Sequence, residues 1–264
     1  MNIRPALLPA LFAVLLTSGC LSYIPPGAKA DLQAFATPDI QAGFAAKATA
    51  PFPATIAAVH VQAPDYSNYY IRNNGGIYGT GKYSIVTVHE AETQAEFDRI
   101  QALPQVAGLI TLNRMLLPAR LRDDRDFRAA AARLRADLVL VYTFDTSFFD
   151  HDAAKPFTVI TLGLSPTRKI TAVTTVSALL MDTRTGYIYS AYEDTERKQT
   201  LSTSWGSRDT ADEARQDTER RAFAKLVDDF ATSWPRLLRQ YGNAAATSTA
   251  PKPSVARPPK MASL

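Results

Sequence analysis

The chain has 264 residues, of which 46% are hydrophobic and 20% charged, so a wholly disordered protein is excluded and a globular domain with a substantial core is predicted. One cysteine and three histidines exclude a disulfide framework and a thiolate metal cluster, and neither a metal nor another cofactor is expected. The formal net charge of +4 arises at the two ends: the 29 basic residues less Arg4 and the three in residues 243–264 leave 25, equal to the 25 acidic residues. A nucleic-acid partner is therefore not expected.

The amino end has the order of an export signal. A short basic start, an apolar run over residues 6–16 and small residues from Thr17 to Gly19 precede Cys20. The apolar run is too short for a spanning helix, which needs about 20 apolar residues, and we predict a signal peptide over residues 1–19. The end of this segment resembles the lipobox of bacterial lipoproteins, although Thr17 stands where that family usually has Leu.

The lipobox resemblance implies that Cys20 is lipidated and becomes the first residue of the mature chain, with palmitate among its acyl chains. By the same resemblance, Leu21 after the cysteine, where some lipoproteins have Asp, implies a place in the outer membrane facing the periplasm. Several acyl chains would anchor the protein stably, whereas a single chain binds membranes only marginally. The alternative is an ordinary secretory signal followed by an incidental cysteine.

The mature chain divides into three parts. Residues 20–52 are rich in Ala and Pro and predict a disordered tether, because they hold too few large apolar residues to offset their ordering entropy. Residues 243–264 predict a disordered tail for the same reason. The globular domain is expected over residues 53–242.

The first half of the domain alternates short strands with a helix. The run 55–61 predicts a buried strand, and the alternation over 83–89 predicts a second one. Thr93 followed by Glu96 has the spacing of a capping box and predicts the start of a short helix that ends near Pro104. A brief strand is predicted over residues 109–112.

The second half predicts a helix over 123–134, a buried strand over 138–144 and a weaker strand over 157–162. The runs 170–181 and 187–195 predict a hairpin in which Gly186 takes a left-handed conformation. Thr210 and Glu213 have the spacing of a second capping box, Pro235 should kink the helix that follows, and its apolar residues recur at helical spacing: Phe223, Leu226, Val227, Phe230, Trp234, Leu237, Leu238 and Tyr241.

These elements predict an α/β (α+β) fold with a single mixed sheet and helices packed on it. Their order resembles the periplasmic domains of CsgG, LpoB and the amino-terminal part of TolB. The resemblance rests on the passage from an Ala-rich helix to an apolar strand over 129–141 and on the hairpin turn with Asp182, Thr185 and Gly186. These motifs are structural, so they imply a fold and carry almost no functional information. The chain also resembles a proteobacterial lipoprotein family, which implies nothing about mechanism.

The candidate partner-binding residues are aromatic. A polar stretch between the first two strands holds Tyr66, Tyr69, Tyr70 and Tyr78, and Trp205 lies in a Ser/Thr run before the last helix. Tyrosine on a polar loop suits recognition, since it adds apolar area at low rotamer cost while its hydroxyl bonds a partner. The alternative is that half of these rings cover the edge of the sheet.

Other motifs fit their functional interpretation poorly. Residues 76–82 match the start of a phosphate loop, but Tyr83 stands where a magnesium ligand is needed and a strand follows instead of a helix. Residues 163–167 begin like a nucleophile elbow and lack its final glycine. His60 and His89 are expected to be ordinary sheet residues.

Three functions are compatible with these observations. The first is a non-enzymatic outer-membrane lipoprotein whose domain binds a periplasmic cell-envelope protein or assembly through residues 66–78. The second is an oligomeric, CsgG-like scaffold, in which the partner is a further copy of the chain. The third and least favoured is an envelope hydrolase that works through Asp150, His151 and Asp152.

Overall fold

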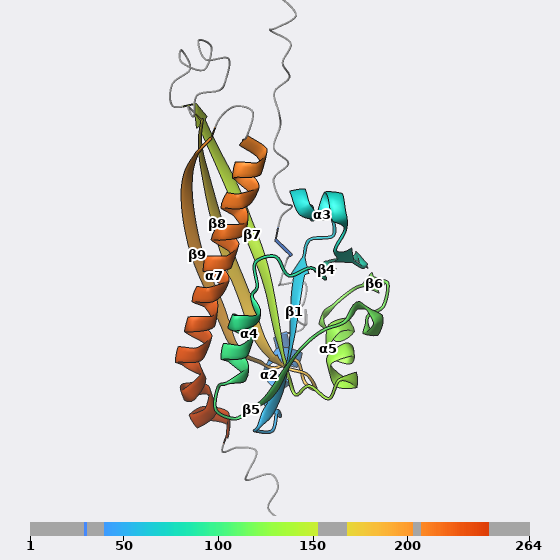
Figure 1. Ribbon diagram of the computed structural model, residues 1–264. Coiled ribbons are helices and arrows are strands. Elements are labelled where there is room, and N and C mark those ends of the chain that lie inside the picture. The colour runs from blue at the N-terminus through green and yellow to red at the C-terminus, as the bar shows by residue number, and fades with distance from the viewer. Residues whose placement is uncertain (1–28, 31–39, 153–167, 203–206, 243–264) are drawn as a thin grey trace, which may run out of the picture.

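The computed structural model describes residues 29–30, 40–152, 168–202 and 207–242 (Figure 1). In chain order, its elements in the first half are α2 (Ile40–Ala45), β1 (Ala54–Gln62), α3 (Tyr69–Asn74), β2 (Ile77–Tyr78), β3 (Thr80–Gly81), β4 (Ser84–Val86), α4 (Gln94–Gln101), β5 (Val106–Thr111) and the 3₁₀ turn η2 (Arg114–Leu116). Those in the second half are β6 (Arg120–Leu121), α5 (Asp124–Arg133), β7 (Leu138–Asp152), β8 (Arg168–Asp182), β9 (Ile188–Ser202), α7 (Ser207–Leu237) and the π-helical turn η3 (Leu238–Gly242).

One seven-stranded sheet forms the framework, in the order β2-β4-β1-β7-β8-β9, and β5 also pairs with β1. The central pair β1 and β7 is parallel, with Ala58 opposite Leu140, whereas β7, β8 and β9 are antiparallel. A separate two-stranded sheet joins β3 and β6. The predicted fold class, a single mixed sheet with helices packed on it, is therefore confirmed.

The strands β7, β8 and β9 are 15 residues each, longer than the sequence predicted. The added residues include polar side chains such as Ser147 and Arg197, which are on a side of the sheet that is exposed to solvent. The weaker strand predicted over 157–162 lies outside the described residues. The strand β8 pairs with β7 on one side and with β9 on the other.

Helices cover both faces of the sheet (Figure 1). Alternate residues of β7 divide between two cores, as the period of a strand requires. Leu140 and Tyr142 pack in one core with α4 and α7, and Val139 and Val141 pack in the other with Phe127 of α5. None of the helices among the described residues is both long enough and apolar enough to span a bilayer.

The helix starts agree with the sequence in two cases of three, because Thr93 directly precedes α4 and Asp123 directly precedes α5. Asp123 caps α5 in a complete capping box with Asp126, near the predicted start. In α4 the hydroxyl of Thr93 contacts the carboxylate of Glu96 and does not cap the backbone, so the predicted capping box is not formed. The helix α7 begins at Ser207, which places Thr210 inside the helix and corrects the predicted start there.

The turn between β8 and β9 is held by Asp182. Its carboxylate accepts the backbone N–H groups of Arg184 and Thr185, at 2.8 and 3.1 Å, and Gly186 has the predicted left-handed φ of 75°. Burial by itself would raise the pKa of Asp182, but hydrogen bonds from Thr49 and from the turn hold it below its usual value.

Part of the Ala/Pro-rich stretch before β1 contacts the domain at this turn. The backbone N–H and the hydroxyl of Thr49 donate to Asp182, at 2.7 and 2.9 Å, and the N–H of Ala50 donates to the hydroxyl of Tyr189 at 3.1 Å. Residue 30 is buried against the sheet. The stretch 31–39 and the tail 243–264 lie outside the described residues.

Candidate functional site

The tyrosine-bearing stretch forms the short helix α3, where the sequence predicted a loop. Asn68 caps this helix, because its side-chain oxygen accepts the N–H of Ile71 at 2.7 Å. Tyr69 and Tyr70 are 41% and 36% exposed, whereas Tyr66 is buried. The hydroxyl of Tyr78 donates to the carbonyl of Leu117 at 3.1 Å, and its ring is half-buried. The structure therefore separates the four tyrosines into two exposed rings and two rings engaged within the chain.

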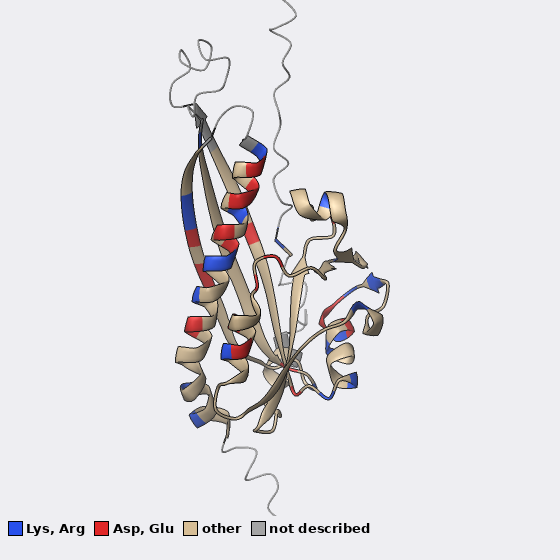
Figure 2. Ribbon diagram, viewed as in Figure 1, with Lys and Arg blue, Asp and Glu red and all other residues tan. Residues whose placement is uncertain are grey.

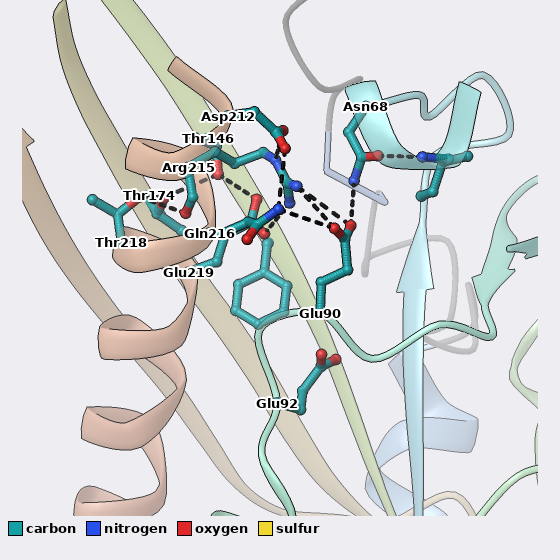
Figure 3. Close-up of polar contacts among 12 residues, drawn as sticks. Asn68, Glu90, Glu92, Thr146, Thr174, Asp212, Arg215, Gln216, Thr218 and Glu219 are labelled. Carbon is teal, nitrogen blue, oxygen red and sulfur yellow. Dashed lines mark hydrogen bonds and ion pairs between the residues drawn. The ribbon is translucent and has the colours of Figure 1, made fainter. Parts of the chain in front are cut away.

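A buried polar network lies beside α3, between the sheet and the first half of α7 (Figure 3). The side-chain amide of Asn68 donates to Glu90 at 3.2 Å and to the hydroxyl of Tyr66 at 3.2 Å. Glu90 in turn accepts Arg215 of α7 through both oxygens, each at 3.3 Å. The cap of α3 is thus joined to α7 through two side chains, Glu90 and Arg215.

Arg215 is the centre of this network and is only 1% exposed. Its guanidinium donates to Asp212 at 2.9 Å and to Glu219 at 2.6 Å, in addition to Glu90. Burial alone would lower the pKa of Arg215, but these carboxylates, Glu219 first, raise it above its usual value. A fully buried guanidinium needs such partners, because an unpaired charge in the interior costs several kcal/mol.

Threonine hydroxyls complete the network on the side of the sheet. Thr146 donates to Glu219 at 3.0 Å and lies 2.9 Å from the hydroxyl of Thr174, which lies 2.7 Å from that of Thr218. Burial raises the pKa of Glu219 to about 7, in spite of Arg215 and Thr146, which both lower it. Glu219 is therefore the group of this network that changes its charge near neutral pH.

A second buried carboxylate, Glu92, brings the two histidines together. The Nδ1 atoms of His60 and His89 lie 2.8 and 3.5 Å from Glu92 Oε1. Burial alone would raise the pKa of Glu92, but His60 and then His89 hold it well below its usual range, and the hydrogen bond to Glu92 raises the pKa of His89. Burial, and next the charge of Glu92, raise the pKa of Tyr142.

The structure confirms that His60 is a sheet residue and corrects the prediction for His89. His60 lies in β1 and is 6% exposed, but His89 follows β4 and is not part of a strand, and both face the same carboxylate. Two imidazoles and a carboxylate are plausible metal ligands by type, yet the described part of the chain holds no group of three or more His, Cys, Asp or Glu side chains arranged for a metal ion.

The remaining predicted site residues lie elsewhere. Cys20 and Trp205 are outside the described residues. Residues 150–152 form the end of β7, paired with residues 168–170 of β8, and so lie in a strand where the sequence suggested a loop.

Sequence reasoning missed the network around Arg215. A signal for it exists, since Arg215 and Glu219 continue the apolar stripe of α7 at spacings of four residues from Phe223. A charged residue on the buried stripe of a helix predicts a buried partner. Glu90 and Glu92 carry no such signal, because they lie in an irregular segment.

No family model and no curated protein matches the chain. Solved structures are similar to it only weakly. A candidate homologue of the neuraminyllactose-binding hemagglutinin from Helicobacter pylori is 10% identical, with a TM-score of 0.33, over 76% of this chain and 94% of that one. The PelC dodecamer from Paraburkholderia phytofirmans is 13% identical, with a TM-score of 0.28, over 69% and 91%. A candidate lipoprotein from Caulobacter crescentus is 15% identical, with a TM-score of 0.24, over 40% and 67%. At these scores the similarities carry no inference about partner or activity.

Proposed function

We propose that the chain is a non-enzymatic lipoprotein, anchored through Cys20 in the outer membrane, whose periplasmic domain binds a cell-envelope protein through α3. The observation that carries this proposal is the pair of exposed rings, Tyr69 and Tyr70, on a helix whose cap is tied to the buried network. Exposed aromatic side chains on a fixed support are the usual anchors of protein interfaces, because they lose little entropy when they bind.

Photo-crosslinking in cells tests the binding surface. A photoreactive amino acid at position 70 should capture one envelope protein, which mass spectrometry identifies. The matched control is position 115, where Met115 is 83% exposed on a different part of the domain and should capture nothing specific. An empty lane at position 70, or the same products from both positions, would contradict the proposal.

The variant Asn68→Ala tests whether the support matters. It removes the cap of α3 and the bond to Glu90, which costs about 1 kcal/mol of local stability. We expect weaker capture from position 70 with the fold intact. The anchor is tested separately: Cys20→Ala should abolish palmitate labelling and release the protein from the outer-membrane fraction.

A second candidate function is an oligomeric scaffold, and the edge of the sheet favours it. Among the described residues, β9 pairs only with β8, so one edge of a 15-residue strand is open to a further strand. An antiparallel pair centred on Thr195 would place Glu193 opposite Arg197 of a second copy, and both residues are exposed. Opposite charges in such positions stabilise strand pairing.

Sedimentation velocity of the Cys20→Ala chain separates the two candidates. A scaffold predicts oligomers that Arg197→Glu dissociates and that the double variant Glu193→Arg/Arg197→Glu restores. A monomer at high concentration would contradict the scaffold and leave the binding surface on α3 untouched.

A further inference from the structure

The small sheet of β3 and β6 lies apart from the network around Arg215 and brings two distant basic segments side by side. Its strands are parallel, with Thr80 opposite Arg120 and Gly81 opposite Leu121. The backbone N–H of Thr80 donates to the carbonyl oxygen of Ala119, and the N–H of Lys82 donates to the carbonyl oxygen of Leu121, both at 2.9 Å. These bonds continue the pairing through Lys82 and fix it next to residue 122.

Gly81 makes this close pairing feasible. Its φ is 123°, and a Cβ atom at this position would lie 2.1 Å from the carbonyl oxygen of Leu121. No L side chain fits there, so the glycine lets the two strands approach. Gly81, one of the glycines that give residues 76–82 their likeness to a phosphate loop, thus serves strand pairing, and β4 follows this segment as the sequence analysis expected.

The pairing places three cations on one face. Side chains alternate along a strand, so Arg120 and Arg122 share a face while Leu121, which is fully buried, points the other way. Lys82 lies on the neighbouring strand and is exposed, as are both arginines. Neighbouring strands lie about 4.8 Å apart, and alternate residues of one strand lie about 6.6 Å apart. The backbone positions of the three residues are therefore close enough for their side chains to contact one small anion.

These cations line a cavity of about 640 Å³ together with Gly81, Leu121 and Asp123. Within the described ranges, no carboxylate forms an ion pair with Lys82, Arg120 or Arg122. The carboxylate of Asp123 instead accepts the N–H of Arg125 at 2.9 Å, as the cap of α5. Figure 2 shows basic residues at β6 and acidic residues directly after it, at the start of α5. Three like charges this close repel one another unless an anion lies between them.

We propose that this cavity binds a phosphate group. Guanidinium groups bind phosphate oxygens in a bidentate manner, and the ammonium of Lys82 adds a point charge beside them. The residues that line the cavity carry three cations and one carboxylate, and a second carboxylate, that of Asp126, accepts the N–H of Arg122 at 2.6 Å. The positive charge that remains favours an anionic group such as a phosphate. The phosphate belongs either to a soluble molecule or to a lipid headgroup, and both present the same chemistry to Lys82, Arg120 and Arg122. This site is independent of the proposed partner surface on α3.

The test is ³¹P NMR of inorganic pyrophosphate with the full chain in a zwitterionic detergent at low ionic strength. Saturable line broadening is expected for the wild-type chain. The double variant Arg120→Gln/Arg122→Gln should weaken binding at least about tenfold, as expected when charged hydrogen-bond donors are lost. Lys82→Gln should weaken it less, because it removes one cation of three.

The matched control is Arg220→Gln, which removes the same charge from an exposed position on α7 and should leave the broadening unchanged. All these variants change exposed side chains, and equal unfolding midpoints will verify their folds. Absence of saturable broadening in the wild-type chain, or equal broadening in the double variant, would overturn the proposal.

A competition experiment identifies the source of the phosphate. Phosphatidic acid is added to the detergent micelles while pyrophosphate is observed. Displacement of pyrophosphate supports the site and identifies a lipid headgroup as a ligand that reaches it. Persistence of the broadening supports the site and identifies its ligand as a soluble phosphate.

Discussion

The interface between α7 and the sheet has two halves of different construction. Toward its carboxyl end, the buried face of α7 is mainly apolar: Phe223, Phe230 and Trp234 are fully buried, and the rings of the last two stack with centroids 5.3 Å apart. Toward its amino end, Arg215 and Glu219 are buried to a similar extent but among hydrogen bonds, and charged residues are dense on this part of the helix (Figure 2).

The difference separates two kinds of stabilisation. Apolar packing is non-directional and its free energy grows with the area removed from water. A buried ionic network adds little net stability, but removing one partner leaves the others uncompensated. We expect the apolar half to supply most of the free energy of unfolding, and the polar half to fix where α7 and the cap of α3 lie.

The largest effect is expected in the apolar half. Phe230→Ala should lower the free energy of unfolding by about 3–5 kcal/mol, because it leaves a cavity between α7 and the sheet. Urea denaturation at neutral pH measures the loss. Phe230→Leu keeps most of the volume and should cost less than half as much, and equal losses for the two variants would contradict a packing role.

A somewhat smaller loss, about 3 kcal/mol, is expected for Arg215→Met, since it leaves Glu219, Asp212 and Glu90 without their shared cation. The double variant Arg215→Met/Glu219→Leu removes the most deeply buried carboxylate as well and should recover much of this loss. The same denaturation experiment compares them. A double variant no more stable than the single one would show that the network contributes directly to stability.

The third effect is a dependence of stability on pH in the polar half, and its slope per pH unit is smaller than either loss above. Because the pKa of Glu219 is about 7 in the folded chain and its ordinary value is 4.5, the folded chain holds a proton between these values that the unfolded chain releases. The free energy of unfolding should therefore fall as pH rises from about 4.5 to 7, by at most about 1.4 kcal/mol per pH unit.

Glu219→Gln keeps a neutral group in place and should flatten the pH dependence in this window. Phe230→Leu, in the apolar half, should leave the slope as in the wild-type chain. His89, whose raised pKa acts in the same direction above about pH 6.5, leaves a residual slope there. Equal slopes in the wild-type and Glu219→Gln chains would contradict the titration of Glu219.

The sequence predicted those features that depend on near neighbours in the chain. The hairpin of β8 and β9, the left-handed Gly186 and the apolar stripe of α7 are all confirmed, because each depends on a single turn or on the period of one element. The predicted helix start at Thr93 is confirmed, although its hydroxyl does not cap the backbone, and the predicted start at Thr210 is wrong because α7 begins at Ser207. Capping-box spacing alone does not fix a helix start, because the local backbone decides whether a hydroxyl reaches an N–H group.

The exposed tyrosines of α3 were among the candidates named from the sequence, although nothing in the sequence separated Tyr69 and Tyr70 from Tyr66 and Tyr78. Their separation depends on how residues 66–78 fold over the edge of the sheet. The basic cavity could not be predicted from the net charge of the domain, which is neutral, because a net charge does not show that Lys82 lies beside Arg122.

The sequence by itself determined the fold class, the main strands, the helices α4, α5 and α7, and the hairpin turn. Only the tertiary structure decided which charges meet. Arg215 and Glu90 are 125 residues apart in the chain, and their contact depends on the register of α7 against the sheet. Periodicity fixes the direction of a side chain relative to its own element, whereas the partner it reaches depends on the packing of elements against one another.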